Sequence, residues 1–105
     1  MKRYQGDDWK FNIALKDTSG VAIDITSDTI TFDLVNLLKD TASTITATFT
    51  ITDGPNGLAE VEIPSASTES LSLGINVISF TRLSGTFTQV IYQNDLNVKK
   101  SAKGL

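Results

Sequence analysis

The chain has 105 residues, a formal net charge of −3, and 40% hydrophobic and 20% charged residues. This length and composition predict one domain with its own hydrophobic core, and they are typical of neither disordered chains nor membrane proteins. Cysteine and histidine are absent, which excludes disulfides, Cys₂His₂ zinc sites, cysteine nucleophiles and histidine-based catalytic triads. The negative net charge argues against a nucleic-acid-binding module.

The two ends of the chain are basic, whereas the rest is acidic. Five of the nine basic residues lie near the ends: Lys2, Arg3, Lys99, Lys100 and Lys103. A polar segment follows the basic N-terminus, so we expect no signal peptide and synthesis in the cytoplasm. No apolar run approaches the roughly 20 residues that a membrane helix needs. The basic tails either keep the chain soluble or reach an acidic neighbour in an assembly.

The first part of the chain predicts three strands. Apolar and polar residues alternate from Trp9 to Leu15, which is the period of a half-buried strand. Residues 17–20 are predicted as a turn because an aspartate can bond its own backbone there and a glycine accepts positive φ. Residues 21–25 are predicted as a short second strand, and residues 29–35 as a third.

The most regular alternation in the chain runs from Thr44 to Thr52. It places one set of residues on the core face: Ile45, Ala47, Phe49 and Ile51. Threonines occupy the other face, and residues 36–43 before this strand are predicted as a loop. Residues 53–57 after it loosely match a calcium loop, but alternating oxygen ligands and a distal glutamate are missing. A tight turn is therefore favoured.

The last part of the chain predicts three more strands. Residues 59–63 alternate and end at Pro64, and a polar segment with one possible helical turn at 67–71 follows. Residues 75–82 are predicted as a buried strand, which the turn 83–86 joins to a strand from Phe87 to Tyr92. Residues 93–95 are predicted as a bulge or turn before the last extended residues, Leu96 to Val98. About seven short strands separated by turns predict an all-β, antiparallel sandwich.

Few residues are candidates for catalysis or ligand binding. Asp7-Asp8 is an acidic pair, but a domain of this size has little room for the cleft that two catalytic carboxylates need. Trp9, Tyr4 and Tyr92 could form a sugar-stacking platform, although Trp9 shares a face with Phe11 and Ile13 and is favoured as a core residue. We expect no enzyme activity, no catalytic residue, no cofactor and no metal ion.

One segment is unusual for a soluble protein. Residues 41–52 contain no charge and no proline, yet they alternate and have high β-propensity. Such a segment either lies inside the sheet or, on a sheet edge, pairs readily with another chain and is covered by that partner. The apolar run 34–38 lies beside it in sequence. We therefore expect a protein-contact surface, and its candidate residues are Val35, Leu37, Leu38, Thr44, Thr46, Thr48 and Thr50.

Several motifs match a known phage pattern. A Gly-Asp entry at residues 6–7 leads into an alternating strand, and a D-x-x-G-x-x-I-D-I-T segment spans 17–26. A strand with the sequence Thr-Ile-Thr-Phe begins at Thr29, and G-x-x-x-V-x-I-P and T-x-x-L-x-x-G segments follow at 57–64 and 68–74. From about Gln5 to Val98, the chain resembles the N-terminal Ig-like domain of upper baseplate and tail-fibre proteins of tailed bacteriophages.

The resemblance implies an Ig-like fold and a structural role in a virion. It implies contacts with other virion proteins and symmetric homo-oligomers such as trimers. Two residues after the glycine that corresponds to Gly74, the family usually has an aromatic residue, but this chain has Asn76. The longer C-terminal fibre portion of the family is also missing, which favours an adaptor or decoration subunit of the tail, baseplate or head. A carbohydrate-binding module is the alternative function.

Overall fold

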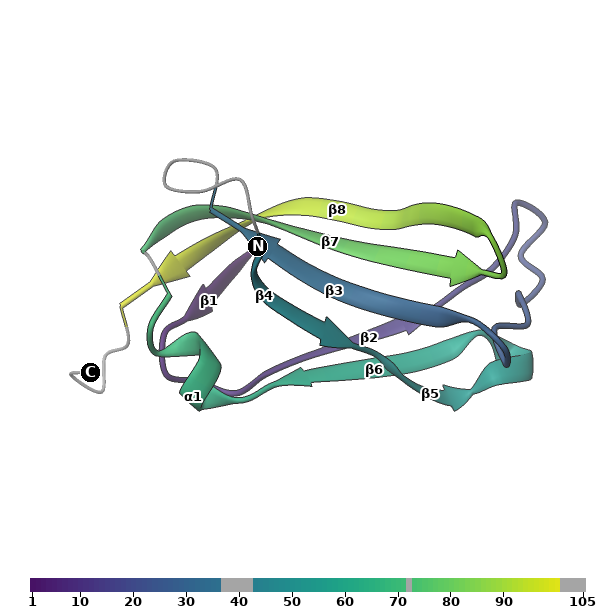
Figure 1. Ribbon diagram of the computed structural model, residues 1–105, viewed down its shortest axis with the longest axis horizontal. Coiled ribbons are helices and arrows are strands. Elements are labelled where there is room, and N and C mark those ends of the chain that lie inside the picture. The colour runs from purple at the N-terminus through teal and green to yellow at the C-terminus, as the bar shows by residue number, and fades with distance from the viewer. Residues whose placement is uncertain (37–42, 72, 101–105) are drawn as a thin grey trace.

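The computed structural model describes residues 1–36, 43–71 and 73–100, and for Ser43 and Thr44 the backbone alone. Two sheets pack face to face, as Figure 1 shows. The larger sheet has the order β1-β8-β7-β3-β4, and the smaller sheet has the order β2-β6-β5. The strands are β1 (Lys2–Tyr4), β2 (Trp9–Ala14), β3 (Thr29–Val35), β4 (Ser43–Thr48), β5 (Thr50–Asp53), β6 (Leu58–Ile63), β7 (Gly74–Ser84) and β8 (Phe87–Lys99). The predicted all-β sandwich is confirmed, with eight strands in the described residues rather than seven.

The core lies between the inner faces of the two sheets, where alternate residues of each strand meet. Phe80 of β7 is at its centre, because its ring contacts four other aromatic rings. The centroids of Phe49 and Tyr92 lie 5.0 Å and 4.9 Å from that of Phe80. Ile30, Leu34, Ile78 and Leu96 are fully buried around these rings. The alternation in the sequence therefore predicted the core faces correctly.

The N-terminal strand β1 was not predicted. It pairs in parallel with the end of β8, from Lys2 opposite Asn97 to Tyr4 opposite Lys99. The N–H of Asn97 donates to the carbonyl of Met1 at 3.0 Å, and the N–H of Gln5 donates to the carbonyl of Lys99 at 2.9 Å. All other strand pairs in the described residues are antiparallel. The larger sheet is therefore mixed rather than purely antiparallel.

The predicted strand from Thr44 to Thr52 is two strands in two different sheets. β4 pairs with β3 in the larger sheet, and β5 pairs with β6 in the smaller one. The chain passes from one sheet to the other at Phe49, whose buried side chain closes this side of the sandwich. The alternation is continuous through Phe49, so periodicity alone does not reveal the change of sheet.

Residues 21–25 form no strand, contrary to the prediction. The only pairing described for them is an isolated bridge between Lys16 and Ala22. Two backbone bonds hold this bridge: the N–H of Asp17 donates to the carbonyl of Val21, and the N–H of Ile23 donates to the carbonyl of Leu15. Other backbone groups bind elsewhere: the Asp17 carboxylate accepts the N–H of Val21 at 3.0 Å, and the Gly54 carbonyl accepts the N–H of Ile25 at 2.9 Å. Side-chain and loop partners have therefore replaced a sheet ladder.

The turn at 53–57 is a short 3-10 helix, Gly54–Asn56, that ends at Gly57 with φ 72°. A Cβ atom at Gly57 would lie 2.6 Å from the carbonyl oxygen of Leu15, so this position needs glycine. The helix α1 is Ser65–Thr68, slightly earlier than the predicted helical turn. The bulge or turn predicted at 93–95 is absent: β8 continues through these residues, and the register shift lies at Ile91 instead. No helix in the described residues is long and apolar enough to cross a membrane.

Candidate protein-contact surface

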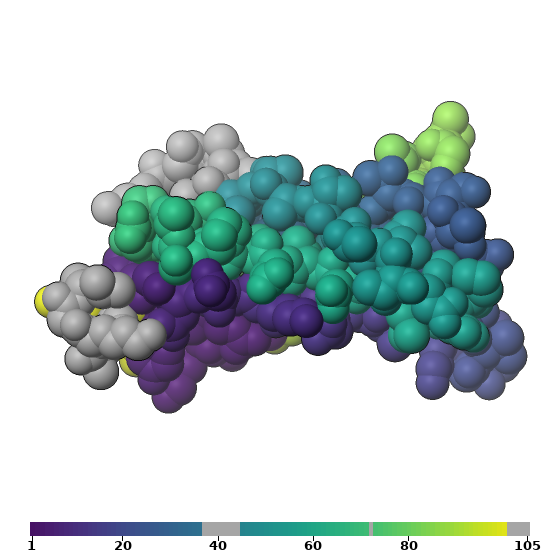
Figure 2. All heavy atoms as spheres, turned by 90° about the horizontal axis from the view of Figure 1, so that it is seen from below, coloured from purple at the N-terminus to yellow at the C-terminus, as the bar shows by residue number. Residues whose placement is uncertain are grey.

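The uncharged residues 43–52 form β4 and most of β5, and each of these strands lies at the edge of its sheet. β4 is the last strand of the larger sheet and β5 is the last strand of the smaller sheet. Figure 2 shows this teal region along one side of the molecule and the purple β2 along the opposite side. The sequence left open whether the segment is central or peripheral, and the structure shows that it is peripheral.

The side chains of β4 and β5 follow the predicted alternation. Thr46, Thr48 and Thr50 are exposed, whereas Ile45 and Ala47 are half-buried toward the core. The hydroxyl of Thr46 donates to the Asp33 carboxylate at 2.9 Å on the outer face of the sheet. The threonines therefore face away from the core, as expected.

The backbone of β4 presents hydrogen-bonding groups at the open edge. The N–H of Phe49 donates to the carbonyl of Ile30 at 2.8 Å. In an antiparallel pair, such bonded positions alternate with positions whose groups point the other way. The pairing of β4 with β3 keeps a constant register from Thr48 to Ile45. The N–H and C=O groups of Thr46 and Thr48 therefore point away from β3, toward the edge of the sheet.

The other contact candidates are placed less completely. Val35 ends β3, where it is half-buried and lies opposite Val77 of β7 and Ser43 of β4. Leu37 and Leu38 lie outside the described residues. Thr44 belongs to β4, but its side chain also lies outside what the structure describes.

A second open surface, on the side of β8, was not predicted. A groove of about 350 Å³ opens between β2 and β8, and its apolar lining includes Phe11, Ile13, Leu15, Phe80, Ile91 and Tyr92. β1 pairs only with Asn97–Lys99, so the outer edge of β8 from Phe87 to Leu96 has no neighbouring strand in the described structure. This surface depends on the pairing of the two ends of the chain, which leaves no local pattern in the sequence.

The three aromatic residues considered for a sugar-stacking platform differ in exposure: Trp9 is buried, Tyr92 is half-buried and Tyr4 is exposed. Trp9 is 1% exposed, and its indole N–H donates to the carbonyl of Tyr4 at 3.0 Å. Trp9 is therefore a core residue, as favoured, and its role as a platform is wrong. Tyr92 is half-buried, with its ring packed against Phe80 and its hydroxyl accepting from the Asn94 amide at 3.0 Å.

The acidic residues singled out in the sequence have structural partners. The Asp8 carboxylate accepts the N–H of Ser65 at 2.7 Å, and the Asp7 carbonyl accepts the hydroxyl of the fully buried Thr68 at 2.8 Å. The Asp53 carboxylate accepts the Asn56 amide at 2.8 Å. Among the described residues, no cluster of three or more His, Cys, Asp or Glu side chains could hold a metal ion.

We expect that removing divalent cations leaves the stability unchanged, because these carboxylates bond to the chain itself. Thermal unfolding followed by circular dichroism, with and without EDTA, measures this. A melting temperature several degrees lower in EDTA would contradict the prediction and would identify the acidic loops as calcium sites.

The fold is an all-β sandwich, in which β4 and β5 are the last strands of the larger and the smaller sheet. A scan against known protein families found no match, and a search of curated proteins found none either. The resemblance to phage Ig-like domains therefore rests on the motifs in the sequence.

Proposed function

We propose that this protein is a structural subunit of a tailed-phage virion, an adaptor or decoration subunit that acts through contacts with other virion proteins. The observation that supports this role most directly is the edge formed by β4 and β5. It has no charge and no proline over 41–52, whereas soluble monomers usually interrupt such an edge with lysine, proline or a bulge. Register shifts lie only toward the two ends of this edge: one between Leu34 and Val35 affects the start of β4, and one between Ile51 and Asp53 affects the end of β5.

The architecture supports the same role. A two-sheet domain with a packed aromatic core presents rigid edges and faces to its neighbours, and the phage domains that the sequence resembles are Ig-like. Of the basic residues near the ends of the chain, Lys2 and Arg3 lie on β1 and Lys99 lies on β8, where they can reach acidic partners. Together these features suit a domain that holds other subunits in place.

The substitution Thr48→Lys tests this role. Thr48 is exposed on an edge strand, so the fold should tolerate lysine to within about 1 kcal/mol. Assembly should weaken, because an unpaired ammonium group buried in an interface costs several kcal/mol. The measurements are the thermal stability of the purified chain and its incorporation into virus particles.

Thr18→Lys is the matched control, because it makes the same chemical change at an exposed turn residue away from both edges. We expect the control to be incorporated like the parent chain. If Thr48→Lys folds and is incorporated as well as the control, this edge is not the contact surface and the proposed role loses its main support.

A further inference from the structure

On each side of the larger sheet, part of the edge has no neighbouring strand among the described residues. On one side, β4 lies within the charge-free residues 41–52. On the other side, β8 lies largely within residues 83–94, which also contain no charge and no proline. β1 covers only the end of β8, and the register shift opposite Ile91 leaves the segment from Tyr92 to Leu96 regular.

The hydrogen bonds between β8 and the segment that contains β1 show which backbone groups of β8 point away from β7. The N–H of Asn97 and the carbonyl of Lys99 both bond to the segment that contains β1. Alternate residues of a strand point their groups to the same side, and β8 keeps a constant register against β7 from Val98 to Tyr92. The N–H and C=O groups of Gln93 therefore point to the same open side, beyond the end of β1. Those of Asp95 do so too, although the N–H of Asp95 donates to the side-chain oxygen of Asn94 at 2.9 Å.

The groove lies directly beneath this edge. Ile91 and Tyr92 of β8 line it on one side, and Phe11 and Ile13 of β2 line it on the other. A strand added beside β8 would continue the larger sheet, and its inward side chains would enter the groove. Ile45 and Ala47 of β4 are inward, apolar and only half-buried, so β4 of a second copy has side chains that suit this place.

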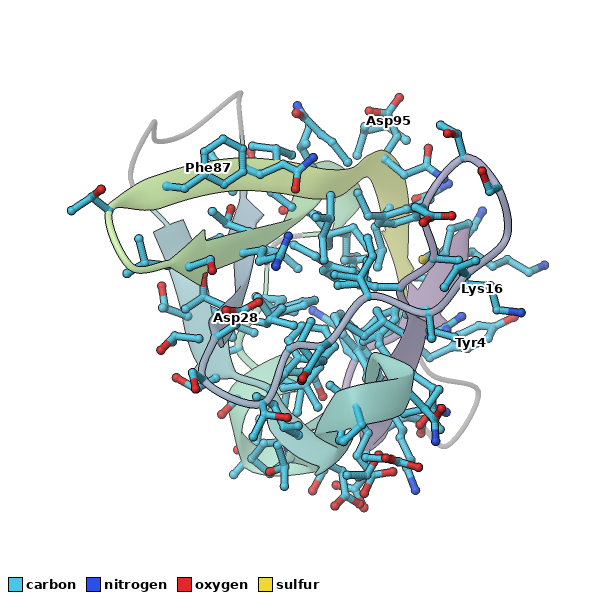
Figure 3. The ribbon with its side chains drawn as sticks, turned by 90° about the vertical axis from the view of Figure 1, so that its right-hand side faces the viewer. Tyr4, Lys16, Asp28, Phe87 and Asp95 are labelled. Carbon is cyan, nitrogen blue, oxygen red and sulfur yellow. The ribbon has the colours of Figure 1, made fainter. Side chains whose placement is uncertain are left out.

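The charges of the two sides are complementary. Strands β3, β4 and β5 carry two acidic residues, Asp33 and Asp53, and no basic residue. Strands β1, β2 and β8 carry four basic residues and one acidic residue, Asp95. The basic residues are Lys2, Arg3 and Lys99, which lie where β1 pairs with the end of β8, and Lys10, which is paired with Glu60 of β6. In Figure 3, Tyr4, Lys16 and Asp95 lie on the side of the purple N-terminal strands, away from Asp28.

We infer that the chain associates head to tail with a second copy of itself, with β4 of one copy added to the open edge of β8 of the next. In a single copy, β4 is antiparallel to β3, β3 to β7, and β7 to β8. When neighbouring copies keep the same orientation, β4 therefore runs antiparallel to the β8 that it joins, which is the more stable ladder. The larger sheet then continues from copy to copy, either in a closed ring or in an open filament.

A symmetric pairing of β4 with β4 fits these observations less well. It would bring the acidic side of one copy against the acidic side of the other, and like charges across an interface oppose association. It would also leave the groove and the edge of β8 uncovered. This inference extends the proposed function by naming a second copy as the occupant of the edge.

Two proline substitutions separate these arrangements. Proline removes a backbone donor and is tolerated on an edge strand where the N–H faces outward. Thr46→Pro disables the β4 edge, and Gln93→Pro disables the β8 edge, without removing a bond to β3 or β7. Thr46→Val and Gln93→Ala keep the backbone donor and are the matched controls.

The experiment is sedimentation velocity on the purified full chain over a range of concentrations, with circular dichroism to confirm that each variant is folded. We expect the parent and both controls to associate, and each proline variant alone to be monomeric. An equimolar mixture of the two proline variants should form a species of two chains and nothing larger. The intact β4 edge of the Gln93→Pro chain can join the intact β8 edge of the Thr46→Pro chain, and the two edges that remain are both disabled. Raising the salt concentration should shift the parent toward monomer, because the charges are complementary.

Three results would overturn the inference. The parent could be monomeric at every concentration, Gln93→Pro could associate like the parent, or the mixture could stay monomeric. The second result would indicate β4–β4 pairing instead. If Thr46→Pro does not fold, Thr48→Lys replaces it in the mixture as the variant with a disabled β4 edge. Gln93→Pro does not alter the β4–β5 edge, so loss of self-association in this variant together with its normal incorporation into particles would leave the proposed virion role intact. The two proposals can therefore fail separately.

Discussion

Replacing Trp9 by alanine is expected to lower the free energy of unfolding by about 3 to 5 kcal/mol, the usual cost of deleting a large aromatic side chain from a core. Trp9 begins β2, is 1% exposed and lies opposite the buried Ile63 of β6. Its indole N–H also donates to the carbonyl of Tyr4, which ties the end of β1 to the smaller sheet. The substitution therefore leaves a cavity and removes a hydrogen bond that connects the two sheets.

Chemical denaturation followed by circular dichroism measures the change. Tyr4→Ala is the control, because Tyr4 is 39% exposed and the substitution keeps the carbonyl that accepts the Trp9 bond. We expect the control to cost far less than Trp9→Ala. If Trp9→Ala unfolds at the denaturant concentration of the parent, the position of Trp9 in the core is wrong.

The parts of the fold that were predictable depend on neighbouring residues alone. The alternation from Trp9 to Leu15 and from residue 29 to 35 predicted strands and their buried faces, because side chains on a pleated strand have a period of two. Glycines at positive φ, such as Gly20 and Gly57, predicted turns for an equally local reason. The same alternation predicted that Thr46 and Thr48 face away from the core.

The parts that were missed depend on distant pairing. β1 has three residues and no alternation, and it exists because it pairs with Asn97–Lys99 at the other end of the chain. The change of sheet at Phe49 and the loss of a strand at 21–25 are decided by which partner takes the backbone groups. For the contact surface, the sequence identified an uncharged segment but not its place at an edge, and it gave no sign of the groove beside β8.

The ion pair between Asp28 and Arg82 supports a prediction of comparable size. The Nε of Arg82 donates to the Asp28 carboxylate at 2.6 Å, and the two side chains are 15% and 6% exposed, respectively. Arg82 lies on the inner face of β7, in the hairpin whose tip projects from the molecule in Figure 2. Asp28→Ala leaves the arginine buried and unpaired, which typically costs about 3 to 5 kcal/mol.

A second ion pair on the same molecule is the natural comparison. Lys10 and Glu60 lie 3.3 Å apart across β2 and β6, with side chains 55% and 40% exposed, so Lys10→Ala should cost at most about 1 kcal/mol. The double variant Asp28→Leu/Arg82→Met removes both buried charges and should recover most of the stability lost in Asp28→Ala. Denaturant unfolding of the three variants measures these differences. If Asp28→Ala costs no more than Lys10→Ala, water already satisfies Arg82 and the pair does not hold the hairpin against the loop that precedes β3.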